Sequence, residues 1–177
     1  MSQDDYEDSL EMARSLLGSG ESPSELWEAN ERVNRALRLR PEEPEAWVLK
    51  SQVLSSLEDE VAALAAANEA LRLAPKSAEA MYMRGALLYD MEIYEEAIRV
   101  LDKALRLVET GDEWLLEEIY YEKGAALDAL DRSDEAVAVF EEGLKRCPES
   151  ELLQTGLAPL RRERVRRTFR LIPGGRP

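Results

Sequence analysis

Small and apolar side chains recur along this chain at spacings of three, four and seven residues, the period of an amphipathic helix. The same arrangement returns in three successive segments. In residues 44–77 these positions are Trp47, Ser51, Leu54, Ala63, Leu64, Ala67, Ala70 and Leu71; in 78–111 they are Met81, Gly85, Leu88, Ala97, Ile98, Leu101, Ala104 and Leu105; in 117–150 they are Tyr120, Gly124, Leu127, Ala136, Val137, Phe140, Gly143 and Leu144. Each segment is predicted to form a pair of helices, and no run alternates as a strand would.

A repeated phrase marks the end of the second helix of each pair. It occupies residues 35–41, 69–75, 103–109 and 142–148, at offsets of 34, 34 and 39, and in three copies it ends in proline. A period of 34 residues is typical of an array of stacked helix pairs. An earlier pair is also predicted, because Ser22 and Glu25 form a capping box at the start of its second helix.

The longer last interval places five extra residues around Trp114. The simplest interpretation lengthens the first helix of the last pair, so that it starts near Asp112. Trp114 would then either fold back over the end of the preceding pair or form a lip beside a binding groove.

These positions resemble the tetratricopeptide repeat family, whose pattern has glycine at position 8, alanine at 20 and 27, a bulky residue at 24 and proline at 32. The matching residues are Gly85 and Gly124; Ala63, Ala97 and Ala136; Ala70 and Ala104; and Pro41, Pro75 and Pro148. The chain departs from the pattern at Ser51, Ala67 and Glu109. The resemblance implies an all-α fold, a right-handed superhelix (α-solenoid) of about four helix pairs plus a C-terminal end helix.

Two domains are expected on this basis. The array occupies residues 1–150, with units at about 10–43, 44–77, 78–111 and 117–150, and a basic end helix and tail occupy 151–177. In the end helix, Leu153, Leu157 and Leu160 form an apolar stripe that would cover the last pair, and Pro159 is expected to interrupt the helix or to begin a second one.

Charge is distributed unevenly over the 177 residues, whose formal net charge is −14. Residues 159–177 contain seven arginines and one acidic residue, a charge of +6, whereas the rest of the chain carries −20. The acidic N-terminus has no apolar stretch typical of a signal peptide, and no apolar run approaches the ~20 residues of a membrane span. With a single cysteine, Cys147, we expect a soluble cytoplasmic protein.

The residues needed for catalysis are largely missing. The chain has no histidine, which removes the commonest general base and the commonest metal ligand. One cysteine without histidine makes no nucleophile pair, and no glycine-rich phosphate loop occurs. Acidic clusters lack the spacing of a calcium loop. The sequence therefore predicts a protein that is not an enzyme and binds no cofactor or metal.

The resemblance implies a concave groove lined by the first helix of each pair. By helical spacing the predicted partner-binding residues are Glu45, Val48, Leu49, Gln52, Glu79, Tyr82, Met83, Tyr89, Glu118, Tyr121 and Glu122. This groove is acidic and rich in tyrosine, which favours a partner with basic residues. Some family members grip a C-terminal carboxylate with basic and amide side chains, but Met83, Glu118 and Glu122 stand where such a clamp needs donors.

We therefore predict an adaptor or scaffold that binds a peptide or helix of another protein, a narrower version being a small secretion-type chaperone. Two alternatives involve the basic tail residues Arg161, Arg162, Arg164, Arg166, Arg167 and Arg170. They could bind an anionic ligand such as nucleic acid or a membrane surface, although the −20 charge of the body opposes this. They could instead meet the acidic face of another copy in a homo-oligomer.

Overall fold

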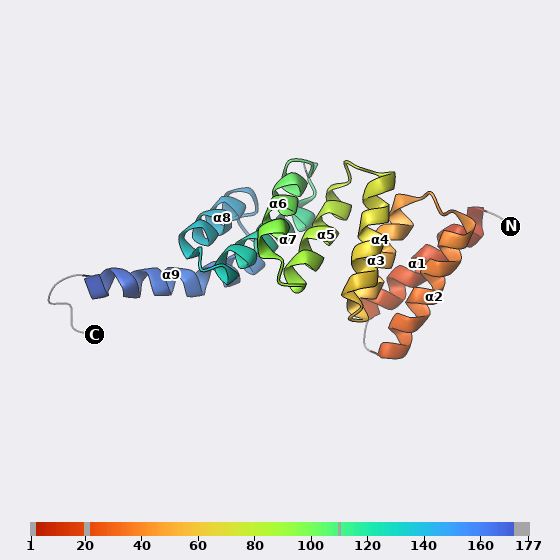
Figure 1. Cartoon of the computed structure of the whole chain (residues 1–177), viewed down its shortest axis with the longest axis horizontal. Coiled ribbons are helices and arrows are strands. Elements are labelled where there is room, and N and C mark those ends of the chain that lie inside the picture. The colour runs from red at the N-terminus through yellow and green to blue at the C-terminus, as the bar shows by residue number, and fades with distance from the viewer. Residues whose placement is uncertain (1–2, 20–21, 110, 172–177) are drawn as a thin grey trace. The chain divides into compact units, whose positions relative to one another are not determined.

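The structure is a computed structural model of the whole chain. It describes the backbone of residues 3–19, 22–109 and 111–171, and the side chains of residues 5–19, 22–109 and 111–166. Every regular element in these ranges is an α-helix, which confirms the predicted all-α fold class (Figure 1). The chain divides into two compact units, unit 1 (residues 1–93) and unit 2 (residues 94–177). The predicted domain boundary at residue 150 is a different division and stays a prediction.

Unit 1 contains α1 (Gln3–Ser19), α2 (Pro23–Leu39), α3 (Pro44–Ser56), α4 (Glu60–Leu73) and α5 (Ala78–Asp90). Unit 2 contains α6 (Tyr94–Leu105), α7 (Glu113–Ala129), α8 (Ser133–Arg146) and α9 (Glu151–Leu171). Within unit 1, α1 packs on α2, α3 packs on α4, and α3 also lies against both α1 and α5. Within unit 2, α7 packs on α6, α8 and α9.

Side-chain caps begin several of the helices. The predicted capping box is confirmed: the backbone N–H of Glu25 donates to Ser22 Oγ, and the backbone N–H of Ser22 donates to Glu25 Oε2. Asp59, Ser77 and Asp112 cap α4, α5 and α7 by accepting the backbone N–H three residues on, at 3.1, 3.1 and 3.2 Å. Each such cap stabilises its helix by about 1 kcal/mol.

The helices α3, α5 and α7 all end in the same turn, which contains a residue with a left-handed backbone. These residues are Glu58, Glu92 and Asp131, with φ of 60°, 61° and 58°. Each donates its N–H to the carbonyl three residues back at 2.9 Å, and the following residue donates to the carbonyl five back, the two bonds of a Schellman motif. Glycine usually occupies this position, so an acidic residue here costs about 1–2 kcal/mol of backbone strain.

In unit 1, α3 is buried on two sides. One hydrophobic cluster joins it to α1 and α2 through residues such as Leu10 and Leu49, and another joins it to α4 and α5 through residues such as Val48 and Met83. The fully buried Ser51 stands at the usual glycine position, where its hydroxyl donates to the carbonyl oxygen of Ala63 at 2.9 Å. A serine in place of glycine buries one additional polar group, the hydroxyl, and this hydrogen bond satisfies it.

A half-buried lysine ties α3 to α2. The Lys50 ammonium donates to Asn30 Oδ1 at 2.5 Å and to Asn34 Oδ1 at 2.7 Å. Burial lowers the pKa of Lys50, an effect opposed by the charges of Glu31 and Asp59. Two neutral amide oxygens therefore satisfy a charge that has lost part of its hydration.

Unit 2 is held by an aromatic ring between two glycines. A Cβ added at Gly124 of α7 would lie 2.5 Å from Phe140 Cζ, and one added at Gly156 of α9 would lie 2.7 Å from Phe140 Cε1. Phe140, on α8, is 2% exposed. Gly124 and Phe140 occupy positions 8 and 24 of their repeat. In the repeat built on α3 and α4 the same positions hold Ser51, which is larger than glycine, and Ala67, which is smaller than phenylalanine.

Two expectations about local structure have clear outcomes. The five-residue insertion lengthens the first helix of the last pair, as predicted: α7 has 17 residues against 13 in α3 and α5, and Asp112 caps it. The expected interruption at Pro159 is wrong, because α9 continues through it. Pro159 is exposed, whereas Leu153, Leu157 and Leu160 of the predicted stripe are buried against α7 and α8.

Candidate functional site

The part of the predicted groove that lies in unit 1 comes from α3 and α5. Glu45 and Glu79 are exposed in the first turns of these helices, and Gln52, Tyr82 and Tyr89 are half-buried. Because α3 lies against α1 on one side and α5 on the other, these first helices form a continuous side of unit 1. The structure thus leaves the polar and aromatic members of the prediction accessible within one unit.

The apolar members of the same prediction are core residues. Val48, Leu49 and Met83 are 4%, 3% and 7% exposed. Leu49 packs in the cluster that joins α1, α2 and α3, while Val48 and Met83 pack in the cluster of α3, α4 and α5. Helical spacing placed these three residues on the groove side of their helices. The structure shows that neighbouring helices of unit 1 cover their side chains instead.

The part of the predicted groove in unit 2 lies on α7. Glu118, Tyr121 and Glu122 are all half-buried. The Tyr121 ring lies 6.1 Å from that of Phe140, tilted by 58°, so the tyrosine is anchored on the core that holds α7, α8 and α9 together. Packing on this core holds the Tyr121 side chain in place, while part of the residue stays exposed.

Charges on the predicted groove are partly balanced inside the chain. Arg14 of α1 forms an ion pair and hydrogen bond with Glu45 of α3, a contact that the sequence reasoning missed because the two residues are 31 positions apart. Among the other predicted residues, none of Glu79, Tyr82, Tyr89, Glu118 and Glu122 is without a partner in the chain. The Arg14–Glu45 pair therefore offsets part of the negative charge of the groove.

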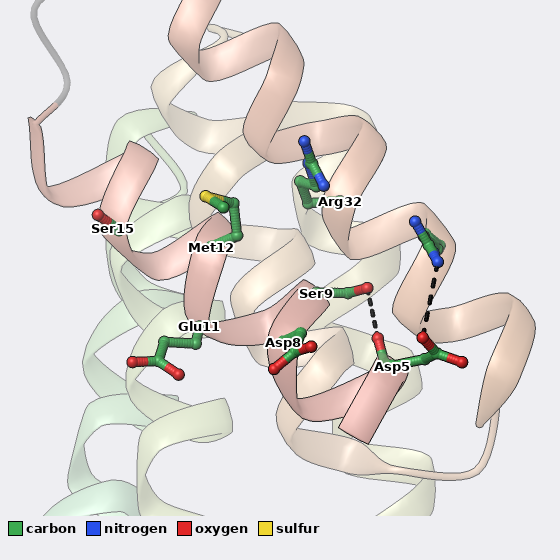
Figure 2. Close-up of a pocket in the computed structure, with 8 residues that line it drawn as sticks. Asp5, Asp8, Ser9, Glu11, Met12, Ser15 and Arg32 are labelled. Carbon is green, nitrogen blue, oxygen red and sulfur yellow. Dashed lines mark hydrogen bonds and ion pairs between the residues drawn. The ribbon is translucent and has the colours of Figure 1, made fainter. Parts of the chain in front are cut away.

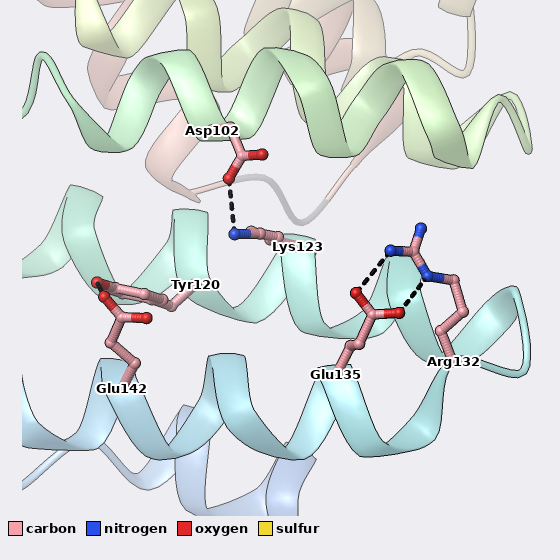
Figure 3. A network of polar contacts seen from close by, with 6 residues as sticks. All are labelled: Asp102, Tyr120, Lys123, Arg132, Glu135 and Glu142. Atoms are coloured by element: carbon pink, nitrogen blue, oxygen red, sulfur yellow. Dashed lines mark hydrogen bonds and ion pairs between the residues drawn. The ribbon is translucent and has the colours of Figure 1, made fainter.

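Neighbouring polar contacts fix α7 between α6 and α8 (Figure 3). Lys123 Nζ lies 2.6 Å from Asp102 Oδ1 on α6, and the Tyr120 hydroxyl donates to Glu142 Oε1 on α8 at 3.3 Å. Burial is the main reason that the pKa of Tyr120 is raised. These contacts orient the helix that carries Glu118, Tyr121 and Glu122, and they bind no ligand themselves.

A groove that the sequence reasoning did not find lies on the outer side of α1 and α2. Its volume is about 480 Å³, and it is lined by Asp5, Asp8, Ser9, Glu11, Met12 and Ser15 of α1 and by Arg32 and Arg35 of α2 (Figure 2). The acidic residues recur three apart along α1, a spacing that could have indicated one charged helix face. We refer to these eight residues as the α1–α2 groove.

The basic end of α9 is the other charged feature. Residues 161–166 are all exposed, and Arg161 pairs with Glu141 of α8 at 2.8 Å. The side chains of Arg167 and Arg170, two of the predicted tail residues, lie outside the described ones. Arg161, Arg162, Arg164 and Arg166 thus lie on an exposed stretch of α9 that follows Leu160, the last buried residue among its described side chains.

The described residues offer little for catalysis. They contain no group of three or more histidine, cysteine, aspartate or glutamate side chains placed to hold a metal ion. Cys147 is buried, and burial raises the pKa of its thiol, the opposite of what a nucleophilic cysteine needs. No helix in the same part of the chain has the length and apolar character to cross a bilayer.

Two family models match overlapping parts of the chain. The model described as "Anaphase-promoting complex, cyclosome, subunit 3" matches residues 28–104, and the model described as "Tetratricopeptide repeat" matches residues 82–151. Together they span α2 to the start of α9. Among the curated proteins, none matches the chain significantly.

Several solved structures share the fold. PilF of Pseudomonas aeruginosa is 20% identical with a TM-score of 0.79, over 98% of this chain and 78% of its own. MamA of Desulfovibrio magneticus RS-1 is 20% identical with a TM-score of 0.68, over 89% and 86%. YrrB, described as a tetratricopeptide protein with an unusual peptide-binding site, is 21% identical with a TM-score of 0.63, over 88% and 76%. Identities this low establish the fold and no more.

Proposed function

We propose that this chain, which belongs to the tetratricopeptide repeat family, is an adaptor or scaffold that binds a peptide or helix of a partner protein. Proteins of this family are generally interaction modules without enzymatic activity. The observation that carries the proposal is the side of unit 1 formed by α1, α3 and α5, where Glu45, Glu79 and Tyr82 remain accessible.

The chemistry of this side fits a peptide better than a small molecule. Half-buried tyrosines offer a large, rigid contact area with a polar tip, the composition typical of binding hot spots. Exposed carboxylates at the margin favour lysine or arginine on the partner and speed its association. A relative such as YrrB, with its peptide-binding site, supports the same class of partner. Tyr121 on α7 is the corresponding candidate in unit 2.

Selection from a displayed peptide library on the immobilised protein tests the proposal. We expect enrichment of peptides with basic residues. Tyr82→Ala should weaken the best of them by roughly 1–3 kcal/mol, as for a typical hot-spot truncation. Little loss of stability is expected, because Tyr82 is only half-buried against the core cluster of α3, α4 and α5. The affinity of Tyr121→Ala for the same peptides, measured separately, tests whether α7 of unit 2 also contributes to binding. Glu118→Lys should mainly slow association and change its salt dependence.

A matched control removes an aromatic residue elsewhere. Trp27 on α2 is 60% exposed and lies outside the predicted residues, so Trp27→Ala should leave the affinity unchanged. If both tyrosine variants are folded and bind every selected peptide as tightly as the parent, the first-helix side is not the binding site.

A further inference from the structure

The basic end of α9 has a helix face that is exposed as far as its side chains are described. Leu160 is the last buried residue among them, and residues 161–166 are all exposed. Arg161 pairs with Glu141, but Arg162 and Arg166 have no hydrogen bond or ion pair to any described residue. Residues three and four apart share a helix face, so Val165, which is 54% exposed, lies with these two arginines. This face of α9 therefore carries one apolar side chain, Val165, together with the basic side chains of Arg162 and Arg166.

The α1–α2 groove of unit 1 offers the complementary set. Both arginines of the groove already form ion pairs within the chain. Arg32 Nη2 lies 2.9 Å from Glu28 Oε1, and Arg35 Nη2 lies 3.9 Å from Asp5 Oδ1. Asp8 and Glu11, by contrast, make no side-chain hydrogen bond or ion pair within the described part of the chain. Figure 2 shows both projecting from α1, with Met12 on the same helix. The net character of the groove toward a partner is therefore acidic, with an apolar contact at its centre.

We propose that the basic end of α9 in one copy of this chain binds the α1–α2 groove of a second copy. The full sequence of α9 carries a net charge of +4 and that of α1 carries −4. The carboxylates of Asp8 and Glu11 are separated by about 4.5 Å of helix rise, and Arg162 and Arg166 by about 6 Å. Arginine side chains are long enough to absorb this difference, and Val165 would meet Met12, which is 46% exposed.

A second copy fits this surface better than an unrelated partner, because both halves of the contact are present on every molecule, are opposite in charge and equal in number, and have similar spacing along a helix. The contact is heterologous, since it joins two different surfaces, and each copy keeps one free half after pairing. The copies should therefore associate head to tail into chains. Each surface lies within one unit, and the inference does not depend on the proposed peptide-binding function.

Paired charge reversals test this contact directly. Sedimentation velocity at low salt should show the parent protein associating as its concentration rises, and association should weaken steeply at ~1 M salt, where the Debye length falls to ~3 Å. Asp8→Lys/Glu11→Lys and Arg162→Glu/Arg166→Glu should each raise the dissociation constant of self-association at least about tenfold, because like charges then face each other.

Mixing the two variants separates this arrangement from general charge effects. The groove variant keeps a normal α9, the α9 variant keeps a normal groove, and the two reversed surfaces are also opposite in charge. An equimolar mixture should therefore associate, although neither variant does so alone. A control that makes the same change in net charge as the groove variant, Glu109→Lys/Glu149→Lys at exposed positions between helices, should associate like the parent. A parent that is monomeric at every concentration, or variants that associate like the parent, would overturn the proposal. A mixture that associates no more strongly than either variant alone would overturn it as well.

Discussion

Gly124→Ala should destabilise unit 2 although alanine is the better helix former. The new Cβ would lie 2.5, 2.7 and 2.8 Å from three atoms of the Phe140 ring, where carbon atoms normally stay about 3.5–4.0 Å apart. The ring has little room to retreat toward α9, because it already packs so closely on Gly156 that a Cβ added there would lie 2.7 Å from Phe140 Cε1. The clash therefore has to be relieved by moving a helix.

The size of the effect follows from two opposing terms. Overpacking of a well-filled core costs about 1–3 kcal/mol, and replacing glycine by alanine inside a helix returns about 0.5–1 kcal/mol. We expect a net loss of about 1–2 kcal/mol in the free energy of unfolding. Gly18→Ala is the matched control, because an added Cβ there meets no atom within 4 Å and should be neutral or slightly stabilising.

Urea denaturation followed by far-ultraviolet circular dichroism measures this difference, with m-values compared to exclude a change in the unfolded state. Combining Gly124→Ala with Phe140→Leu should cost less than the sum of the two single changes, since a smaller side chain removes the clash. If Gly124→Ala is as stable as Gly18→Ala, the close approach of α7 to the Phe140 ring does not exist.

Four further predictions concern local contacts. Glu92→Gly should raise the free energy of unfolding by about 1 kcal/mol in chemical denaturation, because glycine adopts the left-handed turn without strain. Lys50→Met should cost about 1–3 kcal/mol because it leaves Asn30 without its donor, whereas Arg14→Met on the surface should cost less than about 1 kcal/mol. Burial lowers the pKa of Lys50, so the unfolded chain binds its proton more tightly; the stability of the parent relative to Lys50→Met should rise with pH up to about 10.4 and then level off. Because burial raises the pKa of the Cys147 thiol, the native protein should react with iodoacetamide far more slowly than the urea-unfolded chain, and its rate should still rise above pH ~9.

Much of the fold could be predicted from the sequence because it depends on short-range periodicity. Small residues such as Ala97 and Ala104 recur at fixed positions, and both are fully buried as their spacing indicated. The continuous α9 could not be predicted in this way: Pro159 is a helix breaker in general, yet the buried leucines on either side of it keep the helix on the core. The left-handed turns were also missed, because Glu58 and Glu92 stand where glycine would have been the signal.

The candidate site was harder to predict than the fold. Which side of a helix is accessible depends on its neighbours, and Val48 and Met83 are covered by packing between successive first helices. The α1–α2 groove depends on how the side chains of α1 and α2 are arranged around it in space. Spacing along the chain indicates at most one charged face of α1, and it does not show which helix faces are covered or where a groove forms.

The position of α3 in two clusters has a consequence for how unit 1 opens. Its Leu49 belongs to one cluster and its Val48 to the other, so unfolding of α1 and α2 would expose one side of a helix that still supports α4 and α5. Neighbouring helix pairs are thus thermodynamically coupled, and the cooperative element is larger than the 34-residue repeat of the sequence. Amide hydrogens in α3 should therefore exchange with solvent last in unit 1, and a deletion of α1 and α2 should shorten their protection even though α3 to α5 remain intact.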